Sequence, residues 1–144
     1  MNNEFQIDNV LLLIENKLYI HSNNNILHIE LFEELLTEDD NNKMHIVLDN
    51  FYEDCEKNNI SFYILYNFSE LSISNSTNII YNAHIYQDHF NKHIQFLQKN
   101  VKRLCIVIHN YTVRETLNTI LDLYKPDIKP LIIEDIKEIS KYLS

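Results

Sequence analysis

The stretch that decides the fold is ISFYILYNFSELSISNST, residues 60–77. Its first half is a run of aliphatic and aromatic residues whose apolar side chains would face both sides of a strand. Such a strand is typical of the centre of a sheet that is covered by helices. Its second half is a polar loop that leads into a helical pattern. Open α/β sheets place their binding sites at such junctions, so we expect the site of this protein in this loop.

Strand and helix patterns alternate on both sides of this stretch. Strand-like patterns occupy residues 5–14, 18–20 and 26–31, with turns at 15–17 and 21–25, and apolar residues at helical spacing follow over 44–55. Downstream we expect a helix over 79–99, a strand over 103–109, a helix from Thr112, an edge strand at 130–133 and a helix from Asp135. This order predicts one α/β domain over residues 1–144, with a largely parallel sheet flanked by helices and an N-terminal antiparallel hairpin.

The predicted core joins the central strand to the elements after it. We expect Phe62 or Tyr63 to be buried together with residues of the next strand and helix. Those residues are Leu65, Cys105, Val107, Leu117 and Leu121.

Composition limits the classes of partner and cofactor. The formal net charge of −9 argues against a nucleic-acid backbone or an anionic membrane as the partner. The chain contains no glycine, which excludes Gly-rich phosphate-binding loops and leaves asparagine to supply left-handed backbone positions.

The cysteines and the apolar runs bear on the compartment. Cys55 and Cys105 lie within apolar patterns, so we expect buried, reduced thiols and a cytoplasmic protein. The longest early apolar run, residues 10–14, is too short to span a bilayer, and we expect neither a signal peptide nor membrane insertion.

The central stretch resembles the strand-and-loop signature of STAS domains, the family of SpoIIAA-like anti-sigma-factor antagonists. Asn67 stands where the family has an aspartate at the strand end, and Asn75-Ser76-Thr77 stands where it has Asp-Ser-Ser/Thr. The similarity continues over the later strands and helices, to residue 143. Both family aspartates are asparagine here, and Asn78 replaces the glycine that follows the serine pair.

The resemblance implies a STAS-like sheet and a non-catalytic regulatory domain that binds another protein. In the family, a partner kinase phosphorylates the residue at the position of Ser76 and so breaks a complex. We therefore expect Ser76 within one residue of the helix start, with an accessible hydroxyl, in a loop with Asn67, Asn75 and Thr77. The alternative is that Ser76 or Thr77 only caps the helix. The fold also resembles CRAL-TRIO domains, which implies a binder of a lipid or another small ligand.

Metal and catalytic chemistry form a third, weaker hypothesis. His89 and His93 share one helix face, as a zinc pair would, but the sequence offers no third ligand nearby. His109 ends a strand beside the serine-rich loop, but a Ser–His pair there lacks an orienting carboxylate. A metal-dependent or Ser–His hydrolase therefore ranks last, and we expect no catalytic residue, metal or cofactor.

Partner contacts are expected beside the same loop. His109 and Tyr111 follow a strand end, and Arg114 lies in the first helical turn after it, where a cation opposes the helix dipole. An arginine in this position indicates either an anionic or acidic contact or a side chain that simply faces solvent. We expect another protein as the partner, with a homodimer left open.

Overall fold

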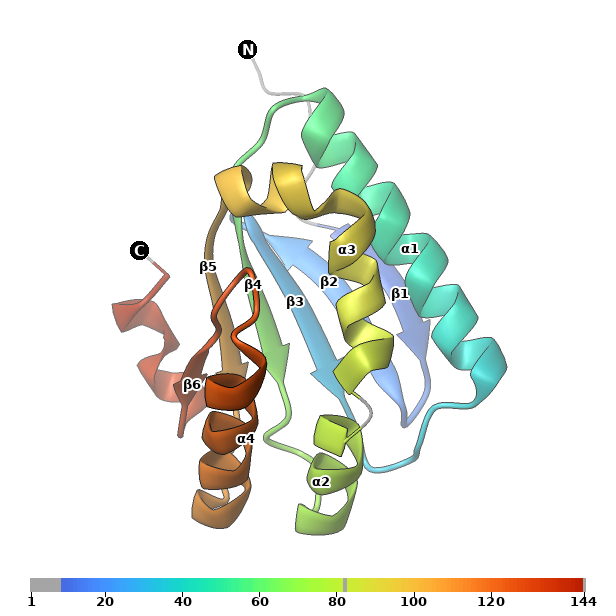
Figure 1. Ribbon diagram of the computed structural model, residues 1–144. Helices are drawn as coiled ribbons and strands as arrows, with labels where there is room; N and C mark the ends of the chain where they lie inside the picture. The colour runs from blue at the N-terminus through green and yellow to red at the C-terminus, as the bar shows by residue number, and fades with distance from the viewer. Residues whose placement is uncertain (1–8, 82, 144) are drawn as a thin grey trace.

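The computed structural model describes residues 9–81 and 83–143, which build one sheet and its covering helices (Figure 1). The six strands follow one another across the sheet in chain order. Three of them form an antiparallel meander: β1 (Asn9–Ile14), β2 (Leu18–Asn23) and β3 (Ile26–Leu31). The later strands continue the sheet in parallel: β4 (Phe62–Asn67), β5 (Val101–Val107) and β6 (Leu131–Ile133). The predicted α/β fold with its N-terminal antiparallel hairpin is confirmed.

The helices connect the parallel strands, and some predicted boundaries were wrong. The connecting helices are α1 (Glu38–Lys57), α2 (Ile73–Tyr81), α3 (Ala83–Asn100) and α4 (Tyr111–Tyr124), and the 3₁₀ helix η1 (Ile136–Lys141) follows the last strand. The helix expected over residues 79–99 is thus two helices, and the first begins earlier, at Ile73. The cap of α4 is Asn110 instead of Thr112, because the Asn110 side chain accepts a hydrogen bond from the Val113 amide at 3.0 Å.

The main core lies on one face of the sheet, beneath α1, α3 and α4. Figure 1 shows α1 and α3 in front of the strands. Met44 and Leu48 of α1, Leu97 of α3 and Leu117 of α4 belong to a single buried cluster with strand residues such as Ile64. Strands in chain order need crossovers of one hand, and such crossovers place every connecting helix on the same face.

A smaller core lies on the opposite face, where η1 packs over β4, β5 and β6. It consists of Leu65, Cys105, Val107 and Ile133, with η1 residues packed against them. The residues predicted to be buried together therefore divide between the two faces. Phe62 and Leu117 are buried on the helix face, and Leu121 is partly buried there. The prediction failed on this point because successive strand residues point to opposite faces.

Both cysteines are buried and free, as expected. Burial raises the pKa of the Cys55 thiol to about 12 and that of Cys105 to about 11. Both thiols are therefore protonated at neutral pH and unreactive.

Asparagine supplies most of the left-handed positions among the described residues. Positive φ angles occur at Asn16, Asn24, Asn25, Asn59 and Lys125. Asn24 and Asn25 form the turn between β2 and β3, and two successive positive φ angles are the mark of a tight type I′ hairpin. The turn predicted over residues 21–25 was therefore too long, since β2 continues to Asn23.

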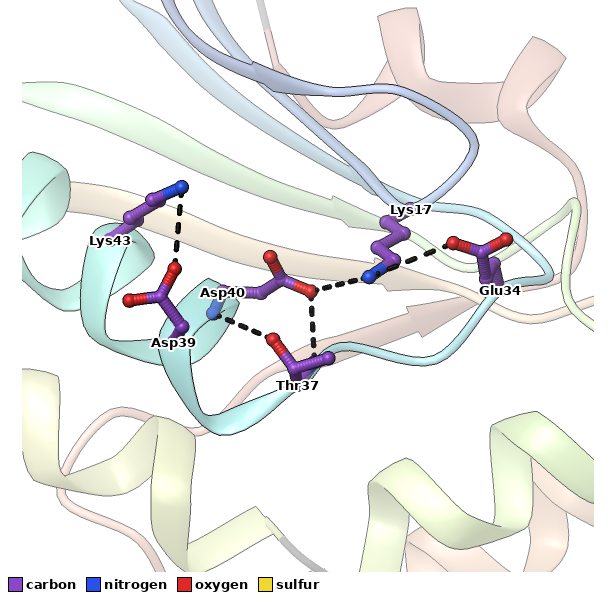
Figure 2. Close-up of polar contacts among 6 residues, drawn as sticks. All are labelled: Lys17, Glu34, Thr37, Asp39, Asp40 and Lys43. Atoms are coloured by element: carbon purple, nitrogen blue, oxygen red, sulfur yellow. Dashed lines mark hydrogen bonds and ion pairs between the residues drawn. The ribbon is translucent and has the colours of Figure 1, made fainter.

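A polar network fixes the start of α1 to the β1–β2 turn (Figure 2). Thr37 and Asp40 form a capping box, in which each side chain accepts a hydrogen bond from the other residue's backbone amide, at 2.9 and 3.1 Å. Lys17, in the hairpin turn, donates to the Asp40 carboxylate at 2.8 Å and lies 3.6 Å from Glu34. The hydrogen bond from Lys17 is the largest cause that lowers the pKa of Asp40 to about 2.

Leu117→Ala tests the helix-face core. Leu117 is 6% exposed, so its truncation should lower the free energy of unfolding by about 2–5 kcal/mol in urea denaturation. Leu123, on the same helix, is 80% exposed and serves as the control; Leu123→Ala should change stability by less than about 0.5 kcal/mol. Equal effects of the two substitutions would show that α4 is wrongly oriented.

Asp40→Asn tests the capping network through pH. A carboxyl pKa lowered in the folded state stabilises the fold above the unfolded pKa of about 3.9, and this stabilisation disappears as pH falls toward about 2. The melting temperature of wild type should exceed that of Asp40→Asn at about pH 6, and the gap should close between about pH 4 and 2. Asp39→Asn, at an exposed position whose carboxylate pairs with the exposed Lys43, is the control and should show a small gap. A gap for Asp40→Asn that does not depend on pH would contradict the network.

Candidate functional site

The loop between β4 and α2 is held by its own polar side chains. The Asn67 side-chain oxygen accepts hydrogen bonds from the Ser69 amide at 3.0 Å and from the Ser69 hydroxyl at 2.6 Å. This is an Asx turn, which bends the chain back directly after the strand. Asn67 is therefore a buried structural residue at the strand end.

Asn75 and Ser72 fasten the start of α2 to the loop between β3 and α1. The Asn75 side-chain amide, through Nδ2, donates to the Glu33 backbone carbonyl at 2.6 Å and to the Glu33 carboxylate at 3.0 Å. The other Glu33 carboxylate oxygen accepts from the Ser72 amide at 2.9 Å. The Ser72 hydroxyl oxygen accepts a hydrogen bond from the Asn75 backbone amide at 3.2 Å and so caps the helix. Two loops that are far apart in sequence are thus joined at the carboxyl ends of β3 and β4.

Ser76 does not have the accessible hydroxyl that the family resemblance implies. Because α2 begins at Ile73, Ser76 lies in the first helical turn and is only 3% exposed. Thr77 is half-buried. A kinase cannot reach the Ser76 hydroxyl in this conformation, so the expected accessible hydroxyl was wrong. Phosphorylation of Ser76 itself stays a prediction, and this burial argues against it.

His109, Tyr111 and Arg114 do lie together at the end of β5. The Arg114 guanidinium donates to the carbonyls of Ile108 and His109, at 2.9 and 2.6 Å, and lies 3.6 Å from the Glu134 carboxylate. These acceptors explain why a cation is stable in the first turn of α4. His109 Nδ1 lies 2.8 Å from the Glu134 carbonyl oxygen. Tyr111 is 67% exposed, with Arg114 5.8 Å from its ring centre.

An acidic hollow lies at the same edge of the sheet. It has a volume of about 520 Å³, is open to solvent and is lined by Asn16, Phe32, Glu33, Glu34 and Glu70. Leu35 and Ile73 are 48% and 57% exposed, and each lies within two residues of the contact between Glu33 and Ser72. Sequence reasoning did not single out this surface, because its residues come from separate loops.

Of the two histidines His89 and His93, which share one helix face, the structure describes only the side chain of His93. His93 is 7% exposed, and its Nε2 atom lies 3.2 Å from an Asp49 carboxylate oxygen on α1. Lys92 contacts the same carboxylate at 3.2 Å. The side chain of His89 lies outside the described residues. His93 therefore serves to join α3 to α1.

A different histidine cluster, which sequence reasoning missed, lies on β2 and β3. The register places His21 directly opposite His28, and the Nε2 atoms of both rings lie 3.5 Å from the same Glu30 oxygen, Oε1. Burial, and to a lesser extent the nearby His21, lowers the pKa of His28 to about 4. The sequence pattern that could have predicted this cluster is His28-Ile29-Glu30 on one strand, with His21 on the strand before the two-residue turn. Placing His21 in the turn concealed it.

Comparison of the chain with protein-family models found no match, and neither did comparison with curated proteins or with solved structures. The resemblance to STAS domains therefore stays a prediction. Within residues 9–81 and 83–143, no helix is long and apolar enough to cross a membrane.

Ser76→Asp tests the burial of this residue directly. A carboxylate forced into a buried position costs free energy of folding, so Ser76→Asp should lower the melting temperature by several degrees, about 1–3 kcal/mol of stability. Ser74→Asp, at an exposed position in the same helical turn, is the control and should be nearly neutral. If both variants melt at the wild-type temperature, Ser76 is accessible and the switch hypothesis returns.

Proposed function

We propose that this chain is a non-catalytic, cytoplasmic protein-binding domain. Its partner surface is the carboxyl edge of the parallel strands, and the partner supplies a basic segment that carries an apolar side chain. The acidic hollow lined by Glu33, Glu34 and Glu70 is the observation that carries the proposal.

Charge complementarity supports a basic partner. The chain has a formal net charge of −9, and three glutamates converge on one hollow. The Glu34 side chain is 60% exposed, so its charge reaches solvent even beside Lys17. A concave surface of one sign attracts ligands of the opposite sign and raises the rate of their association.

Apolar side chains beside the hollow support a protein as the partner, rather than a free cation. Leu35 and Ile73 are half-exposed aliphatic residues. Leu35 lies in the loop between β3 and α1, and Ile73 is the first residue of α2, which the Glu33 contacts join to that loop. Figure 1 shows α2 and α4 side by side beyond the strand ends, and these helices contact each other. Tyr111, at the start of α4, adds an exposed aromatic ring to this edge. Exposed aromatic and aliphatic residues bordered by charges are typical of protein interfaces.

The other sequence-based hypotheses have less support. Lipid binding needs a large apolar cavity. Three hollows lined by described residues, of about 520, 280 and 380 Å³, are open to solvent, and each has polar residues in its lining. Ser–His hydrolysis needs a serine and a histidine that contact each other. Here the Ser69 hydroxyl donates to Asn67, and His109 Nδ1 contacts the Glu134 carbonyl.

Charge reversal tests the partner surface. The probe is a displayed peptide library in which two Lys or Arg residues flank a Leu or Phe, and the affinity of selected peptides is then measured by fluorescence polarisation. Glu70→Lys should weaken binding by more than about tenfold, since like charges in contact cost several kcal/mol. Affinity should also fall as the salt concentration rises.

Glu53→Lys is the matched control. It makes the same charge change at an exposed position of α1, about 22 Å along the helix axis from the first residue of that helix. The affinity of the peptides for this variant should stay within about twofold of wild type, because a residue that does not contact the peptide changes its affinity little. A library that yields no binder, or equal losses in both variants, would contradict the proposed surface.

A further inference from the structure

We propose that His21, His28 and Glu30 form a binding site for one divalent transition-metal ion, and that zinc fits the site best. Two imidazole nitrogens and one carboxylate oxygen all lie within 4.8 Å of one another. The proposal is independent of the partner surface at the carboxyl edge.

The two distances from the Glu30 carboxylate to the histidine nitrogens fit a tetrahedral ion. Glu30 Oε1 lies 3.5 Å from the Nε2 atom of His21 and 3.5 Å from that of His28. Ligand atoms at about 2.1 Å from a tetrahedral ion lie about 3.4 Å apart, whereas neighbouring ligands of an octahedral ion at this radius lie about 3.0 Å apart. Zinc takes histidine and carboxylate ligands in tetrahedral geometry.

The two imidazoles are available for coordination. Their Nε2 atoms are buried and make no hydrogen bond among the described residues, although each faces the Glu30 carboxylate. Buried polar atoms are nearly always satisfied, so an unsatisfied pair directed at one carboxylate needs an explanation.

The ligands stand on a rigid support. Residues of β2 and β3 pair without interruption from Leu18 opposite Leu31 to Asn23 opposite Ile26. The His21 ring also stacks on Tyr19, with ring centres 4.4 Å apart. Sites on paired strands hold their geometry better than sites on loops.

The site is accessible and leaves a coordination position free. The side chains are 22% exposed for His21 and Glu30 and 19% for His28. His21 also lines an open hollow of about 280 Å³, together with Tyr19 and Asn23. Three protein ligands leave the fourth position of a tetrahedral ion for water or a small ligand, as in zinc sites that act on substrates.

The competing explanation is an ion pair without metal, between one protonated imidazole and Glu30. Isothermal titration of the metal-free chain with zinc chloride at pH 7.5 separates the two. We expect one equivalent of zinc to bind to wild type. Glu30→Gln keeps the side-chain shape but removes a metal ligand. It should weaken zinc binding by more than about 100-fold, since losing a residue that only hydrogen-bonds to a ligand already costs about 10–100-fold. His21→Asn with His28→Asn should abolish it.

A control variant and a spectrum complete the experiment. His109→Asn removes a described histidine outside the cluster and should leave zinc affinity unchanged. Cobalt in place of zinc should give the intense visible absorption of a tetrahedral site in wild type and in the control, and not in Glu30→Gln. Circular dichroism and melting without metal show that each variant folds. Zinc should raise the melting temperature of wild type but not that of the variants with substitutions at His21, His28 or Glu30. Absence of stoichiometric zinc, or loss of zinc in the control but not in Glu30→Gln, would overturn the proposal.

Discussion

The order of the strands is the constraint on which the rest of this structure depends. Because the strands from β3 to β6 add in chain order and in parallel, every connection between them passes over the same face. That face receives α1, α3 and α4 and becomes the main core. The opposite face is left to a short C-terminal element, η1, which packs over β4 to β6. The half of this face formed by β2 and β3 carries His21, His28 and Glu30 beside Tyr19 and Ile26, and these polar side chains remain partly open to solvent.

The absence of glycine gives asparagine an unusual role in fixing the register of the sheet. Asn24 and Asn25 both adopt positive φ angles, which closes β2 and β3 with a two-residue turn and sets every pair along the hairpin. A shift by one residue would move His21 to the helix face and separate it from His28. Asn16 similarly shapes the turn that presents Lys17 to Asp40 at the start of α1. Two asparagine turns thus position both the proposed metal ligands and the cap of the first helix.

The sequence predicted the architecture well because periodicity and alternation report directly on burial. The central strand, the amphipathic helices and the edge strand after Pro130 all follow from local patterns. The candidate sites depended on contacts that no local pattern reports. The start of α2 has a cap at Ser72, and that residue is also held by Glu33, which lies 39 residues earlier. Because α2 begins at Ile73, Ser76 is buried within the helix and is not its cap. To predict that His21 lies opposite His28, one must know the exact length of the turn between their strands. The turn predicted over residues 21–25 included His21 and so removed it from the strand.

The two proposed sites lie on different parts of the sheet, one at the carboxyl edge and one on the open face of β2 and β3, so each stands or falls separately. The most direct test of the hairpin register and of the ligand set that it creates is an anomalous difference map from crystals grown with one equivalent of zinc. The expected result is a single strong peak about 2.0–2.2 Å from His21 Nε2, His28 Nε2 and Glu30 Oε1. A well-ordered hairpin with no peak between these three atoms, or with the peak at other histidines, would contradict the proposed zinc site.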